Sequence, residues 1–281
     1  MNDSCRTWHD LAMGATLDTR SRELRREVIR ILGCSGRGHL GSSLSLIEIL
    51  CVLYDHVLKY DPGNPQWEMR DRCILSKGHG CLAMYATLAD KGFFPKEHLD
   101  HFCDSGALLG GHPDAGKVPG IEASTGSLGH GLPIGVGMAL NARFENTGAR
   151  VFVVVGDGEC NEGSVWEAAM LASKHALHNL TVVVDYNKYQ SYDATCVVQD
   201  LEPFAEKWRS FGFGVTEVNG HDKKDLMAAF DRLPVERDKP SAIICHTVKG
   251  KGVPCAENNL EWHHKSKIDA AEIQRLLACL E

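Results

Sequence analysis

The expected fold of this chain is decided by residues 151–163, VFVVVGDGECNEG. They open with an unbroken run of β-forming apolar residues, Val151 to Val155, as a strand buried on both faces requires. A second such run is Leu180 to Val184, and between the two runs Ser164 to Ala176 is rich in Ala, Leu and Met and lacks Gly and Pro. A helix is the natural crossover there, so the segment is predicted to form a βαβ unit with parallel strands.

The turn after the first of these strands carries candidate binding residues. Gly156 and Gly158 permit a tight bend around the carboxylate of Asp157, and a helix is expected to follow, with free N–H groups that suit a bound diphosphate. Asn187 comes just after the second strand, so parallel pairing would bring its amide oxygen to the same edge of the sheet. Two hard oxygen ligands with phosphate oxygens describe a Mg²⁺ or Ca²⁺ site. A lone Gly-Asp-Gly is commonly a plain turn, and only this context favours a binding function.

Length and composition favour a single soluble α/β domain. The chain has 281 residues, 43% hydrophobic and 24% charged, and we expect residues 1–20 to be a loosely ordered lead-in to one domain over residues 21–281. The net charge of −7 argues against nucleic acid as a partner. The eleven cysteines form no Cys-x-x-Cys pair, and no apolar run is long enough to span a membrane. A cytoplasmic location is therefore expected, with Cys51 and Cys245 as core residues.

Three histidines stand among glycines. His39 lies in a Gly-rich loop, His79 follows a short predicted strand at residues 73–75, and His112 lies in a third Gly-rich loop. A Gly-rich loop lets a ligand approach the backbone closely, but His39 alone leaves a structural and a functional interpretation open. His79 would sit at the carboxyl end of its strand, which indicates that these histidines serve one cleft.

Further segments complete the predicted sheet and its helices. Strands are expected at residues 215–218 and 241–246, and the second runs into a Gly/Lys loop at residues 247–252 that is either mobile or closes over a phosphate together with His263. An arginine-rich helix near residues 20–32 is interpreted as a solvated or subunit-facing surface. The glycines nowhere follow a strand with dinucleotide-binding spacing. The expected architecture is a three-layer αβα domain with a mostly parallel sheet.

Several motifs together resemble the transketolase family, specifically its N-terminal half, which binds thiamin diphosphate. The resemblance covers nearly the whole chain from about Leu24, in the family's order. The motifs are Gly38-His39-Leu40-Gly41, Ser76-Lys77-Gly78-His79, Gly111-His112-Pro113, Thr125-Gly126-Ser127-Leu128-Gly129, the unit from Gly156 to Asn187, and the loop from Thr247 to His263.

The resemblance implies a role for each matching residue. Asp157, Asn187 and the backbone carbonyl of Tyr189 would hold the divalent metal, and His39, His112 and His263 would bond the oxygens of a sugar. Neutral histidines suit that task because they can donate a hydrogen bond and pass a proton near neutral pH. Glu162 and Glu167 would join a carboxylate network that links cofactor sites across an interface, or compensate a helix dipole. The implied cofactor contacts are His79, Gly126, Ser127, Leu128, Gly158, Glu159 and His263.

The same resemblance implies transfer of a two-carbon ketol unit from a ketose to an aldose, on sugars or sugar phosphates, by thiamin diphosphate. The family's second half, which completes the site, would come from a C-terminal subunit in an α2β2 assembly. Two alternatives stay open. One is a related decarboxylating enzyme similar to deoxyxylulose-phosphate synthase, and the other is a non-catalytic regulatory relative.

Overall fold

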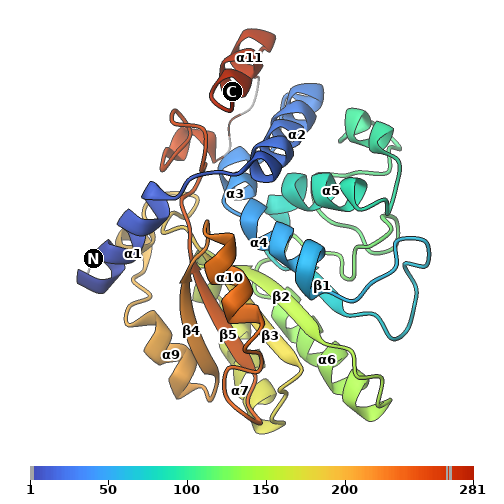
Figure 1. Cartoon of the computed structure of the whole chain (residues 1–281), viewed down its shortest axis with the longest axis vertical. Coiled ribbons are helices and arrows are strands. Elements are labelled where there is room, and N and C mark those ends of the chain that lie inside the picture. Colours follow the sequence, from blue (N-terminus) through green and yellow to red (C-terminus); the bar gives the residue numbers. More distant parts are fainter. Residues whose placement is uncertain (1–2, 264, 266–267) are drawn as a thin grey trace.

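The computed structural model describes residues 3–263, 265 and 268–281, and its centre is a parallel β-sheet (Figure 1). In the described residues the sheet has five strands in the order β1-β2-β3-β5-β4, and every neighbouring pair is parallel. The sheet is therefore parallel throughout, which confirms the expected fold class. The strands are β1 (Arg72–Leu75), β2 (Val151–Gly156), β3 (Leu180–Tyr186), β4 (Gly214–Asn219) and β5 (Ser241–His246).

The predicted βαβ unit forms at the middle of this sheet. Helix α7 (Gly163–Lys174) connects β2 to β3, and the register pairs Gly156 with Asp185. Because both strands end at the same edge, Asp157 and Asn187 leave the sheet side by side, as the sequence predicted.

Helices cover both faces of the sheet, which gives the three layers seen in Figure 1. The alternation of side chains along β2 divides the core: Phe152 and Val154 join one buried cluster, and Val151, Val153 and Val155 join the other. The first cluster packs under α2 (Thr19–Ser35), α4 (Ile47–Val52), α5 (Cys81–Asp90) and α10 (Lys223–Phe230), and the second under α6 (Gly131–Phe144), α7 and α9 (Phe204–Ser210).

The remaining helical elements are short and lie mostly in the connections between the layers. Cys51 and Cys245 are buried core residues, as expected. No helix in the described ranges combines the length and apolar character needed to cross a bilayer. The short helical elements are α3 (Leu40–Leu44), a π turn (Leu53–Val57), α8 (Thr195–Val198), α11 (Ala270–Ala278) and the 3-10 turns Gly78–Gly80, Lys96–His101, Gly158–Asn161 and Leu260–Trp262.

The N-terminal segment differs from the loosely ordered lead-in that its sequence suggested. It contains helix α1 (Asp3–Gly14), which lies against the carboxyl ends of β4 and β5 (Figure 1). The ring of Trp8 stacks on His246 with 5.1 Å between centroids, and the Asn219 side chain donates to the carbonyl of Leu11 at 3.1 Å. Tertiary contacts of this kind stabilise a helix whose own pattern is weak.

Candidate active site

A cleft of about 580 Å³ opens at the carboxyl edge of the sheet. Its walls come from the loops that follow β1, β2 and β3, together with the segments around His39 and His263. In parallel α/β sheets this edge is where ligands bind. The cleft therefore lies where the sequence placed it.

The structure brings the four predicted histidines together on one side of the cleft. The ring of His39 lies 5.5 Å from that of His79, 6.5 Å from His112 and 5.7 Å from His263, measured between centroids. His79 and His263 are 5.8 Å apart. Residues separated by up to 224 positions thus form one cluster, which favours the functional over the structural interpretation of His39.

Two contacts fix the state of the histidines. His39 Nδ1 lies 2.8 Å from the carbonyl oxygen of His263, which can only accept, so Nδ1 carries a proton. Burial and then the charge of Lys77 hold the pKa of His79 well below its ordinary value. His79 is therefore neutral near pH 7.

The three expected metal ligands offer oxygen atoms at the cleft. Asp157 Oδ2 accepts from the Lys188 N–H at 2.9 Å and the Thr195 hydroxyl at 2.8 Å, and within the described chain no bond is formed by its Oδ1. The Asn187 amide donates to Asp185 at 3.2 Å, which orients its oxygen, and that oxygen accepts from the Tyr189 N–H at 3.2 Å.

This donor set fits a hard divalent cation. Carboxylate, amide and carbonyl oxygens are the ligands that Mg²⁺ and Ca²⁺ take, and phosphate oxygens can complete the coordination. Across the described ranges no three His, Cys, Asp or Glu side chains gather as a metal-binding group, so a cation here would depend on this mixed set. Burial raises the pKa of Asp157, and a bound cation would favour its ionised form.

Glycines keep the backbone close to the cleft at two of the predicted contacts. Gly126 has φ +146°, and a Cβ there would lie 3.0 Å from His112 Cδ2. A Cβ on Gly158 would lie 2.9 Å from Cγ of Gln190. Gly126 and Leu128 line the cleft, whereas the neighbouring Ser127 is exposed and does not line it.

The predicted carboxylates divide into three environments. Glu159 is buried and accepts from the N–H groups of Gly129 at 2.9 Å and Gly156 at 3.1 Å, and from the Ser76 hydroxyl, so its carboxylate already braces the cleft wall. Glu162 is exposed and lines the cleft, and Glu167 is exposed on α7 outside it. The cofactor contact of Glu159 and the interface network of Glu162 and Glu167 stay predictions.

Sequence reasoning missed two lysines. Lys77, at the end of β1, forms a buried ion pair with Asp185, which also accepts from the Ser45 hydroxyl at 2.6 Å and from Thr247. Burial raises the pKa of Asp185, but Lys77 and these hydrogen bonds outweigh it and lower the pKa. An acidic residue that ends an apolar strand was the available signal, because a buried carboxylate needs a cation nearby.

Lys249 is the second missed residue. Its Nζ donates to the carbonyls of Tyr189 at 3.0 Å and Gln190 at 3.1 Å, both at the cleft. Burial lowers its pKa to about 7. The loop that carries it was expected to be either mobile or phosphate-closing, and the buried side chains of Thr247, Lys249 and Lys251 favour an ordered loop.

Comparison with known proteins identifies the family of the chain. Residues 21–280 match the family model "Transketolase, thiamine diphosphate binding domain". The chain is 41% identical, over 88% of its length and 90% of the relative's, to the 6-deoxy-6-sulfo-D-fructose transketolase subunit of Clostridium sp. (strain MSTE9). It is 40% identical, over 89% and 88%, to an apulose-4-phosphate transketolase subunit of Phocaeicola vulgatus.

A solved structure shows the same fold in a longer chain. The transketolase from Leishmania mexicana superimposes with a TM-score of 0.86 at 30% identity, covering 95% of this chain and 41% of that one. The family model, the two subunit relatives and the shared fold identify the same family. The chain belongs to the transketolase family, as its thiamine-diphosphate-binding domain.

Proposed function

We propose that this chain is the N-terminal, thiamin-diphosphate-binding subunit of a two-subunit transketolase. The observation that carries the proposal is the convergence, in one cleft, of the oxygen donors of Asp157 and Asn187 with four histidines. A purely structural role would not require that combination. The subunit names of the two relatives support the same function.

In this proposal Mg²⁺ is held by Asp157, Asn187 and the carbonyl of Tyr189, and Ca²⁺ would fit the same ligands. Lys77 and Lys249 supply positive charge near the diphosphate. Thiamin diphosphate, when bound, supplies the carbanion chemistry for ketol transfer. The further cofactor contacts are His79, Gly126, Ser127, Leu128, Gly158, Glu159 and His263.

The histidines of the cluster then bind and orient the sugar. His39 donates from Nδ1 to the His263 carbonyl, and in the neutral tautomer that this bond favours its Nε2 would accept a proton from a sugar hydroxyl. His112, exposed at the cleft, would bond a second oxygen of the sugar. Holding several hydroxyls at once orients the substrate for reaction.

A partner chain completes the site in this proposal. Apolar side chains are exposed at the cleft and on α7: Tyr192 and Val198, which line the cleft, are 86% and 42% exposed, and Met170 of α7 is 56% exposed. Exposed apolar groups that gather beside a cleft favour a protein interface. We propose that this partner is a C-terminal subunit in an α2β2 complex, with Glu162 and Glu167 at the interface. A cytoplasmic location remains the expectation from cysteine usage.

The relatives' names suggest a substrate class. Apulose 4-phosphate and 6-deoxy-6-sulfo-D-fructose are both ketoses that end in an anionic group, a phosphate in one and a sulfonate in the other. We therefore propose a ketose with a terminal phosphate or sulfonate as donor and an aldose as acceptor.

Calorimetric titration of thiamin diphosphate with Mg²⁺ tests the proposal directly. The wild-type chain mixed with a candidate C-terminal subunit should bind tightly, the chain by itself weakly, and Asp157→Ala in the mixture not measurably. Asp231→Ala, which removes an exposed carboxylate at the end of α10, is the matched control and should bind as wild type. Absence of binding in every mixture would reject the cofactor assignment.

A transfer assay on the same mixture tests the reaction. Ketoses ending in phosphate or sulfonate are offered with a short aldose, and the two-carbon-extended product is measured. The mixture should form product, and neither of the two chains should form any by itself. Cofactor binding without transfer to any aldose would favour the decarboxylating or the regulatory alternative.

A further inference from the structure

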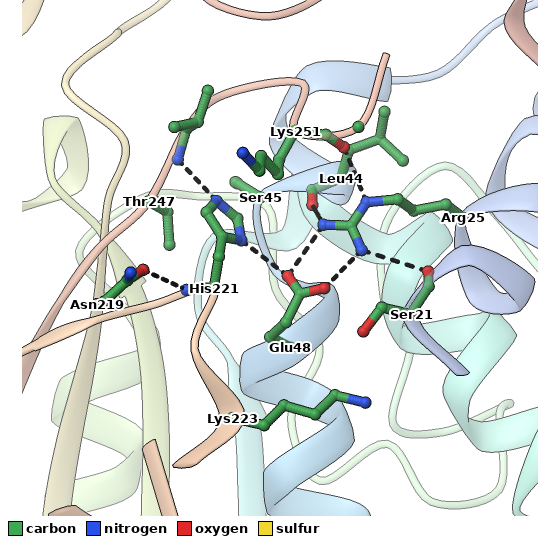
Figure 2. A network of polar contacts seen from close by, with 12 residues as sticks. Ser21, Arg25, Leu44, Ser45, Glu48, Asn219, His221, Lys223, Thr247 and Lys251 are labelled. Atoms are coloured by element: carbon green, nitrogen blue, oxygen red, sulfur yellow. Dashed lines mark hydrogen bonds and ion pairs between the residues drawn. The ribbon is translucent and has the colours of Figure 1, made fainter. Parts of the chain in front are cut away.

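A second set of buried polar residues, Arg25, Glu48 and His221, lies outside the cleft and is called the anchor network here (Figure 2). Arg25 comes from α2, Glu48 from α4, and His221 from the turn after β4. The three are 0%, 1% and 3% exposed. None of them lines the cleft, so cofactor contact does not explain their burial.

Hydrogen bonds define the protonation of this network. Arg25 donates to both oxygens of Glu48, from Nη1 at 2.6 Å and Nη2 at 2.9 Å. The backbone N–H of Val248 donates to His221 Nε2 at 2.9 Å, so Nε2 is unprotonated and Nδ1–H donates to Glu48 at 2.7 Å. His221 is thus neutral and oriented between a carboxylate and a backbone amide.

The network's two backbone contacts on the 247–252 loop flank two residues, Lys249 and Gly250. His221 accepts from Val248, and Arg25 Nε donates to the carbonyl of Lys251 at 2.8 Å. Between them stands Lys249, whose Nζ reaches the carbonyls at the cleft. Gly250 closes the turn with φ +82°, a conformation that favours glycine, and its N–H donates to the Gly41 carbonyl at 3.0 Å.

Stability alone gives a poor reason for such a network. Removing two charges from water is costly, and well-packed apolar residues often serve as well or better. What apolar residues cannot do is hold a backbone N–H and a backbone carbonyl in fixed places. We propose that the Arg25–Glu48–His221 network is a positioning device that holds the 247–252 loop so that Lys249 enters the cofactor cleft in one orientation.

The functional consequence of this inference rests on the proposed function. If Lys249 must point at the diphosphate, loosening the loop lowers cofactor affinity although no cofactor contact is removed. The structural consequence does not depend on any cofactor. Loss of the bond between Val248 and His221 should increase opening of the loop in the chain by itself.

Two substitutions of His221 separate its two bonds. An Asn side chain places its amide near the ring's Nδ1, so His221→Asn can keep a donor for Glu48 but loses the acceptor for Val248. A Gln side chain reaches the place of Nε2, so His221→Gln can keep that acceptor but loses the donor. Leu177→Ala, which empties a fully buried position in the cluster on the other face of the sheet, controls for general destabilisation.

Amide hydrogen exchange over residues 247–252 is measured on the full chain without cofactor, and thiamin diphosphate with Mg²⁺ is then titrated into each variant mixed with the candidate C-terminal subunit. His221→Asn should exchange faster in this loop and bind about tenfold more weakly. His221→Gln and Leu177→Ala should exchange there as wild type does and bind within about threefold of it.

The two measurements distinguish failure of this inference from failure of the proposed function. Unchanged exchange in His221→Asn, or equal acceleration in all three variants, would overturn the positioning role. If wild type binds no cofactor, the proposed function fails and the exchange comparison alone decides. Faster amide hydrogen exchange in this loop without a loss of cofactor affinity in His221→Asn would also count against the inference, because the loop would then not orient Lys249 for binding.

Discussion

The cofactor cleft and the anchor network both bury charges, but they pair them differently. In the anchor network Glu48 meets Arg25 through two hydrogen bonds and His221 through a third. In the cleft Asp157 accepts from an amide and a hydroxyl, and Lys249 donates to two carbonyls. Within the described residues neither of these two cleft residues has an ion-pair partner.

This difference separates charges that are balanced within the fold from charges kept available for a ligand. A buried charge without a counter-charge is costly, and such cost is usual at sites whose missing partner is a ligand. Mutations that unpair the network should therefore lower the stability of the fold strongly, whereas mutations of the unpaired residues at the cleft should lower binding with little change in stability. Lys77 lines the cleft but is paired with the buried Asp185, so this pair belongs energetically with the first class.

The largest expected effect comes from unpairing the anchor network. Arg25→Met leaves the Glu48 carboxylate buried without its cation and should lower the free energy of unfolding by about 3–5 kcal/mol. Arg30→Met, which removes the partly exposed ion pairs of Arg30 with Glu27 and Asp100 on the same helix, should cost only about 1 kcal/mol. Urea unfolding of both variants measures the difference. A loss below about 1 kcal/mol for Arg25→Met would show that the network is not held by charge pairing.

Lys249→Met should show the opposite pattern. Removing an unpaired buried ammonium should change the free energy of unfolding by only about 1 kcal/mol, because its desolvation cost is relieved as two hydrogen bonds are lost. Cofactor affinity should fall by about 10- to 100-fold as a charge-assisted contact disappears. Lys251→Met is the control, since Lys251 bonds the Met13 carbonyl of α1. Equal losses of cofactor affinity in Lys249→Met and Lys251→Met would contradict a specific role of Lys249 in binding.

The sequence could predict the cleft because its strands have a recognisable apolar pattern and because parallel strands follow a known rule of sheet topology. Val151 to Val155 and Leu180 to Val184 are long β-forming runs, and parallel strands must end at one edge, so Asp157 and Asn187 were placed together correctly. Glycine-flanked histidines likewise indicated loops at that edge. Local pattern and a single topological rule sufficed for these residues.

The anchor network could not be predicted in this way. Glu48 lies 23 residues from Arg25 and 173 from His221, and no periodic pattern links them. Arg25 was interpreted with its neighbours as part of a solvated or subunit-facing arginine surface, and this was wrong because it is fully buried. Whether one arginine of this helix is buried depends on the segments that pack against it in the folded chain. The helix at α1 was missed for a similar reason, since its contacts with β4 and β5 are tertiary.

The pH dependence of stability sharpens the comparison further. Burial lowers the pKa of His221 below 6.5, and the neighbouring charges of Arg25 and Lys251 act in the same direction, although Glu48 opposes them. Below pH 6.5 the unfolded chain binds a proton at this histidine that the folded chain does not. Stability should therefore fall as pH falls, by up to about 1.4 kcal/mol per pH unit, until the lowered pKa is reached.

His221→Gln has no titratable ring at this position, so its comparison with wild type isolates the contribution of His221 to the pH dependence of stability. Glu48, whose pKa is also lowered, keeps its charge in this range and contributes only at more acidic pH, with the same sign. The free energy of unfolding of wild type and His221→Gln is measured by urea between pH 7 and pH 5. The difference between them should shrink on acidification, and a constant difference would mean that the pKa of His221 is the same in the folded and the unfolded chain.

The smallest effect is expected at Ser21, which borders the anchor network without joining it through its hydroxyl. Ser21 is 1% exposed, and among the described residues its Oγ has no hydrogen-bond partner, while its backbone carbonyl accepts from Arg25 at 3.3 Å. Ser21→Ala keeps that carbonyl and removes only a buried hydroxyl that forms no bond. The free energy of unfolding should stay within about 0.5 kcal/mol or rise slightly. A loss above about 1 kcal/mol would place the hydroxyl inside the network, because only a bonded group costs that much to delete.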